Sequence, residues 1–253
     1  MASLVTDDNH TTMTTTTRRW TTTTEASQGT RFEDLPGILQ TCIGTSTKPG
    51  LIAYFDDDIL AMINMFAKTS KKFLEYDPLR CYYFRVVLTK KYGVNFDDSR
   101  VNLNGKNIHD EDLQNVVEAL KANNTLKWLF LNNNNITDVQ SIGELLKRNN
   151  TLTRLDLENN NITDVQSIGD GLKTNNTLET LDLCDNNITD DSGIQSIIDG
   201  LKTNNTLKLL RLNGNQLSRN MKSQLKAIEQ YKRDGSNGYQ QVEGMQIWCR
   251  YID

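Results

Sequence analysis

The sequence contains few side chains whose type and spacing would support catalysis. Its two histidines, His10 and His109, have no nucleophile or carboxylate beside them in a recognisable catalytic arrangement. No glycine-rich phosphate loop, dinucleotide-binding motif or H-E-x-x-H zinc motif is present. The acidic run at 56–58 is expected to begin a helix rather than to bind a metal. The sequence therefore predicts a protein that is not an enzyme and that uses no metal or cofactor.

The cysteines and the net charge narrow the class of protein further. Cys42, Cys81, Cys184 and Cys249 are scattered and form no C-x-x-C pair, so we expect free thiols. A formal net charge of −4 gives no sign of nucleic-acid binding. No apolar run approaches the roughly 18 residues that span a bilayer, and the N-terminus lacks the apolar stretch of a signal peptide. We expect a cytoplasmic monomer without a membrane contact, with a nuclear location also open.

An internal repeat supplies the elements that would position a binding site. Nearly identical segments begin at Asn124, Asn150 and Asn176, and a fourth copy begins at Asn205. Each carries the pattern L-x-x-L-x-L-x-x-N-x-(I/L), and the first leucines of the copies are separated by 26, 26 and 29 residues. The alternating leucines predict a short strand, and the apolar residues that follow have helical spacing. One copy cannot bury its leucines alone, so the copies must stack.

This pattern resembles the leucine-rich repeat family, in particular its ribonuclease-inhibitor-like repeats. The resemblance implies an α/β solenoid, a horseshoe segment with parallel strands inside and helices outside. With a degenerate first copy, we expect five strand–helix units over 94–232. Stacked strands lie about 4.8 Å apart and packed helices about 8–10 Å apart, so the stack is expected to bend. The asparagines at 134, 160, 186 and 215 are expected to satisfy backbone groups at the strand ends, and Lys106 replaces this asparagine in the first copy.

The side chains between the strand leucines are the candidate binding residues, because they point out of the concave surface. Trp128 and Phe130 are notable, since exposed aromatics are typical of interface hot spots. Carboxylates beside them are expected to suit a basic rim on a protein partner. The predicted partner-binding set is Arg100, Trp128, Phe130, Arg154, Asp156, Glu158, Asp182, Asp185 and Arg211. The alternative is that the N-terminal block covers the two aromatic residues.

The N-terminal third differs in composition from the repeats. Residues 1–30 are rich in threonine and predict a disordered tail, whereas 31–93 predict a small all-helical domain. Two parts of this domain resemble the opening and the later half of the F-box, with a longer spacing between them that indicates an insertion near 44–52. The resemblance implies a binding surface for a ubiquitin-ligase adaptor at Leu35, Pro36, Ile38, Leu39, Ile63, Phe66 and Phe73. The alternative is that 31–93 only cap the first repeat.

Residues 233–253 are expected to cap the other end of the stack. Met245, Ile247, Cys249 and Tyr251 alternate on one face of a predicted closing strand, and Trp248 and Tyr251 are expected to seal this end. Together these patterns predict a protein–protein interaction module. The expected function is that of an F-box-like substrate receptor of a cullin-RING ubiquitin ligase, whose repeats hold the target. The alternative is a freestanding leucine-rich repeat scaffold or inhibitor with a helical cap and no link to a ligase.

Overall fold

A computed structural model describes residues 3–7, 10–14, 77–121, 123–189 and 192–249 of the 253-residue chain. At the N-terminus, β1 (Ser3–Asp7) and β2 (His10–Thr14) form an antiparallel pair. The sequence predicts disorder for this segment, but its many threonines are β-branched and fit a strand. The predicted early helices and all seven F-box-like positions, from Leu35 to Phe73, lie outside the described residues.

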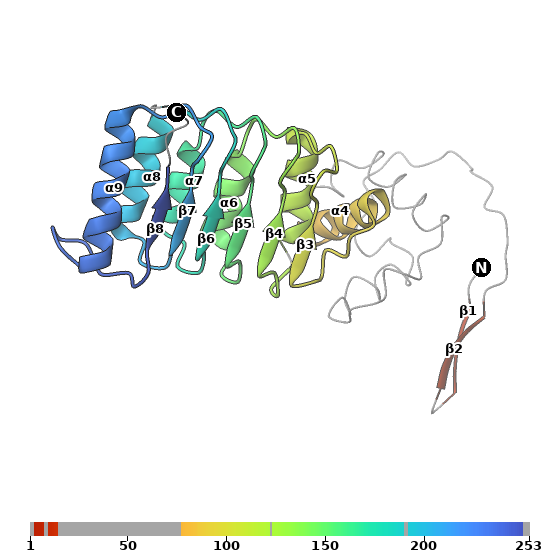
Figure 1. The fold of residues 1–253 in the computed structure, drawn as a ribbon. Coiled ribbons are helices and arrows are strands. Elements are labelled where there is room, and N and C mark those ends of the chain that lie inside the picture. Colours follow the sequence, from red (N-terminus) through yellow and green to blue (C-terminus); the bar gives the residue numbers. More distant parts are fainter. Residues whose placement is uncertain (1–2, 8–9, 15–76, 122, 190–191, 250–253) are drawn as a thin grey trace, which may run out of the picture.

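A single row of parallel strands organises the rest of the described chain. The strands follow one another in chain order, and helices line one side of the sheet they form (Figure 1). The strands are β3 (Arg100–Asn102), β4 (Trp128–Phe130), β5 (Arg154–Asp156), β6 (Thr180–Asp182), β7 (Leu209–Arg211) and β8 (Gln246–Trp248). The helices that alternate with them are α5 (Asp110–Leu120), α6 (Gln140–Arg148), α7 (Gln166–Leu172), α8 (Ser192–Thr203) and α9 (Arg219–Asp234). The predicted α/β solenoid with an unclosed parallel sheet is confirmed.

The strand register agrees with the repeat phase that the sequence predicts. Leu129 pairs with Leu155, and Leu155 pairs with Leu181, across successive parallel strands. These three leucines are completely buried, as are the first leucines of the same repeats. Burial of a leucine relative to exposure contributes about 1.5–3 kcal/mol, so each stacked leucine adds substantially to the stability of the solenoid. Each repeat therefore depends on its neighbours for its own core.

Asparagine side chains hold the corner after each strand. The Asn134 amide donates to the carbonyl oxygens of Leu131 at 2.8 Å and Leu103 at 3.0 Å, while its side-chain oxygen accepts from the Ile108 amide at 3.0 Å. The asparagines at 160, 186 and 215 repeat this arrangement one copy further along. The expected structural role of these buried asparagines is thus confirmed. One amide satisfies three backbone groups that the corner would otherwise leave unpaired.

Small residues bring neighbouring helices unusually close together. A Cβ atom added to Gly143 would lie 2.5 Å from the Ser167 carbonyl oxygen, and one added to Gly169 would lie 2.4 Å from the Ser196 carbonyl carbon. The Ser167 hydroxyl donates to the Val139 carbonyl oxygen at 3.0 Å across the same gap. Close helices reduce the difference between helix spacing and strand spacing, which is the difference that bends such a stack. These glycines therefore limit the curvature that the leucine pattern alone predicts.

Both ends of the stack are covered by additional elements. The helix α4 (Asp77–Tyr92) packs against α5, and Leu88 and Tyr92 join the core of the repeats. At the other end β8 adds a sixth parallel strand, with Met245, Ile247 and Cys249 buried as the sequence predicts. The predicted closing strand is confirmed. Tyr251 lies outside the described residues.

Candidate functional site

The candidate site is the concave face, defined here as the side chains of β3–β8 and the residues just after them that point away from the helices. The paired strands align these side chains in three columns. One column contains Arg100, Trp128, Arg154, Thr180, Leu209 and Gln246; the next contains Asn102, Phe130, Asp156, Asp182, Arg211 and Trp248; the third contains Asn104, Asn132, Glu158, Cys184 and Asn213. The structure thus brings together the predicted binding residues of five different repeats. Asp185 lies just beyond this face in a turn with positive φ.

An aromatic cluster occupies the N-terminal part of the concave face. The rings of Trp128 and Phe130 meet edge to face with their centroids 6.3 Å apart. The Arg100 guanidinium lies 3.8 Å from the centre of the Trp128 ring, and that of Arg154 lies 5.4 Å from the Phe130 ring. Cation–π contacts of this kind hold the rings in place. Trp128 nevertheless remains 37% exposed, and most of the N-terminal block that could cover it lies outside the described residues.

An acidic cluster of Asp156, Glu158 and Asp182 occupies the middle of the concave face. One carboxylate oxygen from each residue lies within 4.8 Å of the others. The sequence predicts exposed carboxylates, but this is wrong for Asp156 and Asp182, which are 7% and 1% exposed. Asp182 accepts from the Arg211 guanidinium at 3.0 Å and from the Cys184 amide at 3.1 Å, and these bonds hold it within the sheet. Asp156 accepts from the Glu158 amide at 3.2 Å, with Arg154 at 3.8 Å.

Crowding and burial change the protonation behaviour of this cluster. Burial raises the pKa of Asp156, and the nearby charge of Asp182 raises it further. The pKa of Glu158 is also raised, first by desolvation and then by the charges of Asp182 and Asp156. Three oxygen ligands of this kind suit a hard cation in principle. Two of the three carboxylates already accept protein hydrogen bonds, however. The cluster therefore belongs to the network of charged side chains on the concave face.

Cys184 sits beside the acidic cluster but is not poised for chemistry. It is 8% exposed, and burial raises the pKa of its thiol to about 12, with the Asp182 charge acting in the same direction. Because the thiolate is the reactive form, this cysteine is expected to be a weak nucleophile. Cys81, Cys184 and Cys249 are free and buried, which agrees with the prediction of free thiols for these three.

A second aromatic residue, Trp248, lies at the C-terminal end of the same face. It is 40% exposed, and the Arg211 guanidinium stands 4.7 Å from its ring. The sequence predicts that Trp248 seals the end of the stack, which is wrong. The alternation that buries Met245, Ile247 and Cys249 already places the positions between them, 246 and 248, on the opposite face. Applying that alternation to residue 248 would have identified this concave residue from the sequence.

Comparison with known proteins agrees with the architecture. Residues 151–171 and 177–201 match the family model of the Leucine Rich Repeat. These two segments therefore match leucine-rich repeats, and the parallel solenoid with its asparagine corners has the architecture of such repeats, which typically serve as non-enzymatic modules for protein–protein interaction. The chain carries the repeat in a short array between a helical N-terminal element and a closing strand. A search of curated protein sequences finds no significant match.

Solved structures with a similar arrangement were also found. One is leiomodin-1 actin-binding site 2, at 24% identity and a TM-score of 0.44, covering 58% of this chain and 88% of that one. Another is the internalin inlF of Listeria monocytogenes, at 18% identity and a TM-score of 0.38, covering 56% of this chain and 32% of that one. A third is internalin C2 from the same organism, at 20% identity and a TM-score of 0.29, covering 66% and 84%.

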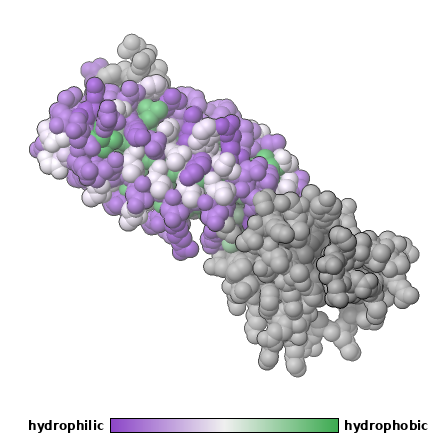
Figure 2. All heavy atoms as spheres, turned by 90° about the horizontal axis from the view of Figure 1, so that it is seen from below, coloured by the Kyte–Doolittle hydropathy of each residue, from purple (hydrophilic) through white to green (hydrophobic). Residues whose placement is uncertain are grey.

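The surface and the helices give two further observations. Figure 2 shows one face of the molecule on which hydrophilic residues predominate and hydrophobic ones are scattered. Of the residues that the structure describes, Trp128 and Trp248 are the large hydrophobic side chains that stay exposed. No helix in the described ranges is long and apolar enough to cross a membrane.

Proposed function

We propose that the concave face is the surface through which this leucine-rich repeat protein binds a protein partner. The observation that carries the proposal is the placement of Trp128 and Trp248, the exposed large hydrophobic residues of the described chain, on one face of the sheet. Exposed aromatic residues are costly in water and are enriched among interface hot spots. Each is steadied by an arginine, so little side-chain freedom would be lost when a partner binds.

The size of the surface limits the form of the partner. Trp128 lies on β4 and Trp248 on β8, four strand spacings apart, which corresponds to about 19 Å. The acidic cluster lies between the two aromatic positions. A partner element that spans both would be an extended segment or a helix that presents a basic residue between two apolar ones. The negative centre would also favour such a partner through long-range attraction.

Site-directed photo-crosslinking tests this proposal in the full-length protein. A benzophenone side chain at position 128 or 248 should capture a partner, whereas the same group at the exposed convex position of Glu144 should not. Capture from 248 should fall when Trp128 is replaced by alanine, because the two positions serve one interface. Equal capture from the concave and convex positions would refute the assignment of the concave face.

We further propose, from the F-box-like pattern alone, that Leu35, Pro36, Ile38, Leu39, Ile63, Phe66 and Phe73 bind a ubiquitin-ligase adaptor. The repeats would then hold the target of the ligase, and the protein would act in the cytoplasm or nucleus. Pull-down with the purified adaptor tests this link. Binding should be lost in a Leu35→Ala, Phe66→Ala double variant and kept in a Trp128→Ala variant.

The runner-up is a freestanding scaffold or inhibitor, and one structural observation favours it. The helix α4 packs on the first repeat through Leu88 and Tyr92, and Lys91 pairs with Asp112 of α5 at 2.6 Å. An element that packs on the first repeat in this way covers the end of the solenoid, as a cap would. If the wild-type protein fails to bind the adaptor while concave positions still capture a partner, the protein is a freestanding scaffold or inhibitor and not a ligase receptor.

A further inference from the structure

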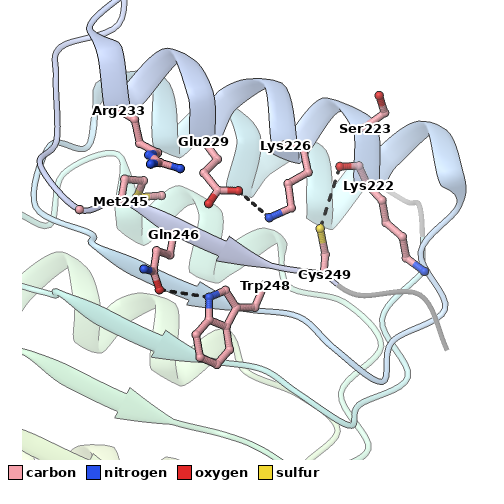
Figure 3. Close-up of a pocket in the computed structure, with 10 residues that line it drawn as sticks. Lys222, Ser223, Lys226, Glu229, Arg233, Met245, Gln246, Trp248 and Cys249 are labelled. Atoms are coloured by element: carbon pink, nitrogen blue, oxygen red, sulfur yellow. Dashed lines mark hydrogen bonds and ion pairs between the residues drawn. The ribbon is translucent and has the colours of Figure 1, made fainter.

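A groove runs between α9 and β8 at the C-terminal end of the sheet, away from the centre of the concave face. Its volume is about 930 Å³, and Figure 3 shows side chains from the helix and the strand bordering it. Met245 and Cys249, which flank β8, line it on the strand side, and Trp248 stands at its border with the concave face. The groove thus combines an apolar strand with a polar helix face.

The helix side of the groove is positively charged. Lys222, Lys226 and Arg233 lie on one face of α9 because their spacing follows the helical repeat, and Glu229 is the carboxylate among them. Lys226 pairs with Glu229 at 2.6 Å. Among the described residues, the guanidinium of Arg233 has no ion-pair partner. This basic groove is a local exception in a chain whose formal net charge is −4.

The strand side of the groove is the open edge of the sheet. β8 pairs with β7 along one side, and no described strand pairs with its other side. The Gln246 amide and the Trp248 carbonyl oxygen bond toward β7, to the Lys208 carbonyl oxygen at 2.8 Å and the Leu212 amide at 2.7 Å. Successive residues of a strand direct their backbone groups to opposite sides, so those of Ile247 face the groove. Its carbonyl oxygen there accepts from the Lys226 ammonium at 2.6 Å.

The Lys226 side chain, bonded to the Ile247 carbonyl oxygen, covers the edge of the sheet, and an incoming strand can displace it. An incoming strand could donate a backbone N–H to Ile247 in its place. Lys226 would then be released from that carbonyl and could pair with a carboxylate on the incoming strand. The exchange replaces one hydrogen bond by another and lets the Lys226 ammonium, which already pairs with Glu229, contact a second carboxylate, so it favours an acidic strand over a neutral one.

We propose that this groove binds an extended acidic peptide segment of a partner protein, which joins the sheet as a seventh strand beside β8. Its acidic side chains face Lys222, Lys226 and Arg233 on α9. The alternate side chains are apolar and face Trp248. Main-chain hydrogen bonds to β8 supply affinity, and the basic helix face supplies selectivity. This site shares Trp248 with the concave-face site but does not include Trp128 or the acidic cluster.

Fluorescence anisotropy with designed peptides tests the proposal on the full chain. The probe is a labelled eight-residue peptide of alternating glutamate and valine, and we expect saturable binding. Two matched peptides carry N-methyl groups on the glutamates only or on the valines only. Alternate N–H groups of a strand point to opposite sides, so one methylated peptide should bind at least about tenfold more weakly and the other should bind like the probe.

Variants of the protein test the basic face of α9. A Lys226→Met, Arg233→Gln double variant should bind the glutamate peptide about tenfold more weakly, and a lysine-for-glutamate peptide should not bind the wild type. Lys147→Met is the matched control, because Lys147 forms an equivalent exposed i,i+3 pair with Glu144 on α6. Both this control and Trp128→Ala should bind the peptide normally. Circular dichroism melting verifies that each variant is folded.

Several outcomes would overturn the proposal. Equal binding of the probe and both N-methylated peptides would show that no strand is added to β8. Unchanged binding by the Lys226→Met, Arg233→Gln variant would remove the basic face from the site. A wild-type chain that sediments as a dimer, and becomes a monomer when Lys226 and Arg233 are changed, would assign the edge to a second copy instead. Trp248 borders both sites, but Trp128 lies only in the concave-face site, and Lys226 and Arg233 lie only in the groove, so failure of one proposal can be told apart from failure of the other.

Discussion

Trp128 and Trp248 stand on the same concave face, but the strands that carry them differ in what they offer a partner. β4 has a paired strand on both sides, so its backbone groups are used within the sheet and only its side chains are available. Among the described strands only β7 pairs with β8, so β8 presents Trp248 together with the backbone of Ile247. Both tryptophans have a stacked arginine and similar exposure. An interior strand can therefore bind by shape and charge, whereas the edge strand can also bind by strand addition.

The largest expected effect comes from the core that both regions share. Leu155 is completely buried in β5 between the two tryptophans. Replacement of Leu155 by aspartate should lower the free energy of unfolding by roughly 3–5 kcal/mol, because a charge without a partner would be buried. Chemical denaturation measures the loss. A variant with the midpoint of the wild type would contradict the repeat register described above.

The next effect separates the two tryptophans. Trp128→Ala should weaken binding of the concave-face partner by about 2 kcal/mol and change stability little, because hot-spot residues act at the interface rather than in the core. The same variant should leave the acidic peptide at β8 unaffected. Isothermal titration calorimetry and thermal melting give the two quantities. If Trp128→Ala lost several kcal/mol of stability with no separate effect on binding, the residue would belong to the core.

A smaller effect concerns the acidic cluster between them. The pKa of Asp156 is raised in the fold, chiefly by burial, so its ionised form opposes folding above the folded-state pKa. Asp156→Asn should therefore raise the free energy of unfolding at pH 7 by about 1 kcal/mol or less. The gain should disappear as the pH falls through the folded-state pKa toward the unfolded value near 3.9. Denaturation curves at pH 7 and pH 3.5 measure the difference, and a loss of stability at pH 7 would be the contrary result.

The smallest effect is expected at the sheet edge. The Lys226 side chain is 55% exposed and pairs with Glu229, and exposed pairs contribute about 0–1 kcal/mol to stability. Lys226→Met should thus change the melting temperature no more than the matched Lys147→Met control does. Differential scanning calorimetry of both variants provides the check. A much larger loss for Lys226→Met would mean that the lysine maintains the closing strand instead of covering a binding edge.

The sequence predicts the solenoid because its information is local and repeated. The leucines define the buried face of each strand, and the asparagine at each corner satisfies groups that any such turn exposes. With the register known, the columns on the concave face follow from strand alternation. Trp128, Phe130 and Arg154 were therefore identified correctly as neighbours. Trp248 lies after the last repeat and lacks the motif, so the columns derived from the repeats do not include it, and only the alternation of the closing strand places it on the same face.

Only the tertiary structure decides which side chains within those columns are exposed, which are buried and which charges pair. Asp182 can be buried because Arg211, 29 residues later and directly opposite it on the adjacent strand β7, neutralises its charge. Burial raises the pKa values of Cys184 and Glu158, and the nearby charge of Asp182 raises both further. The sequence by itself determined the backbone and the direction of each side chain, because the repeat fixes both. Burial, charge pairing and the open edge at β8 depend on contacts between repeats, which no single repeat encodes.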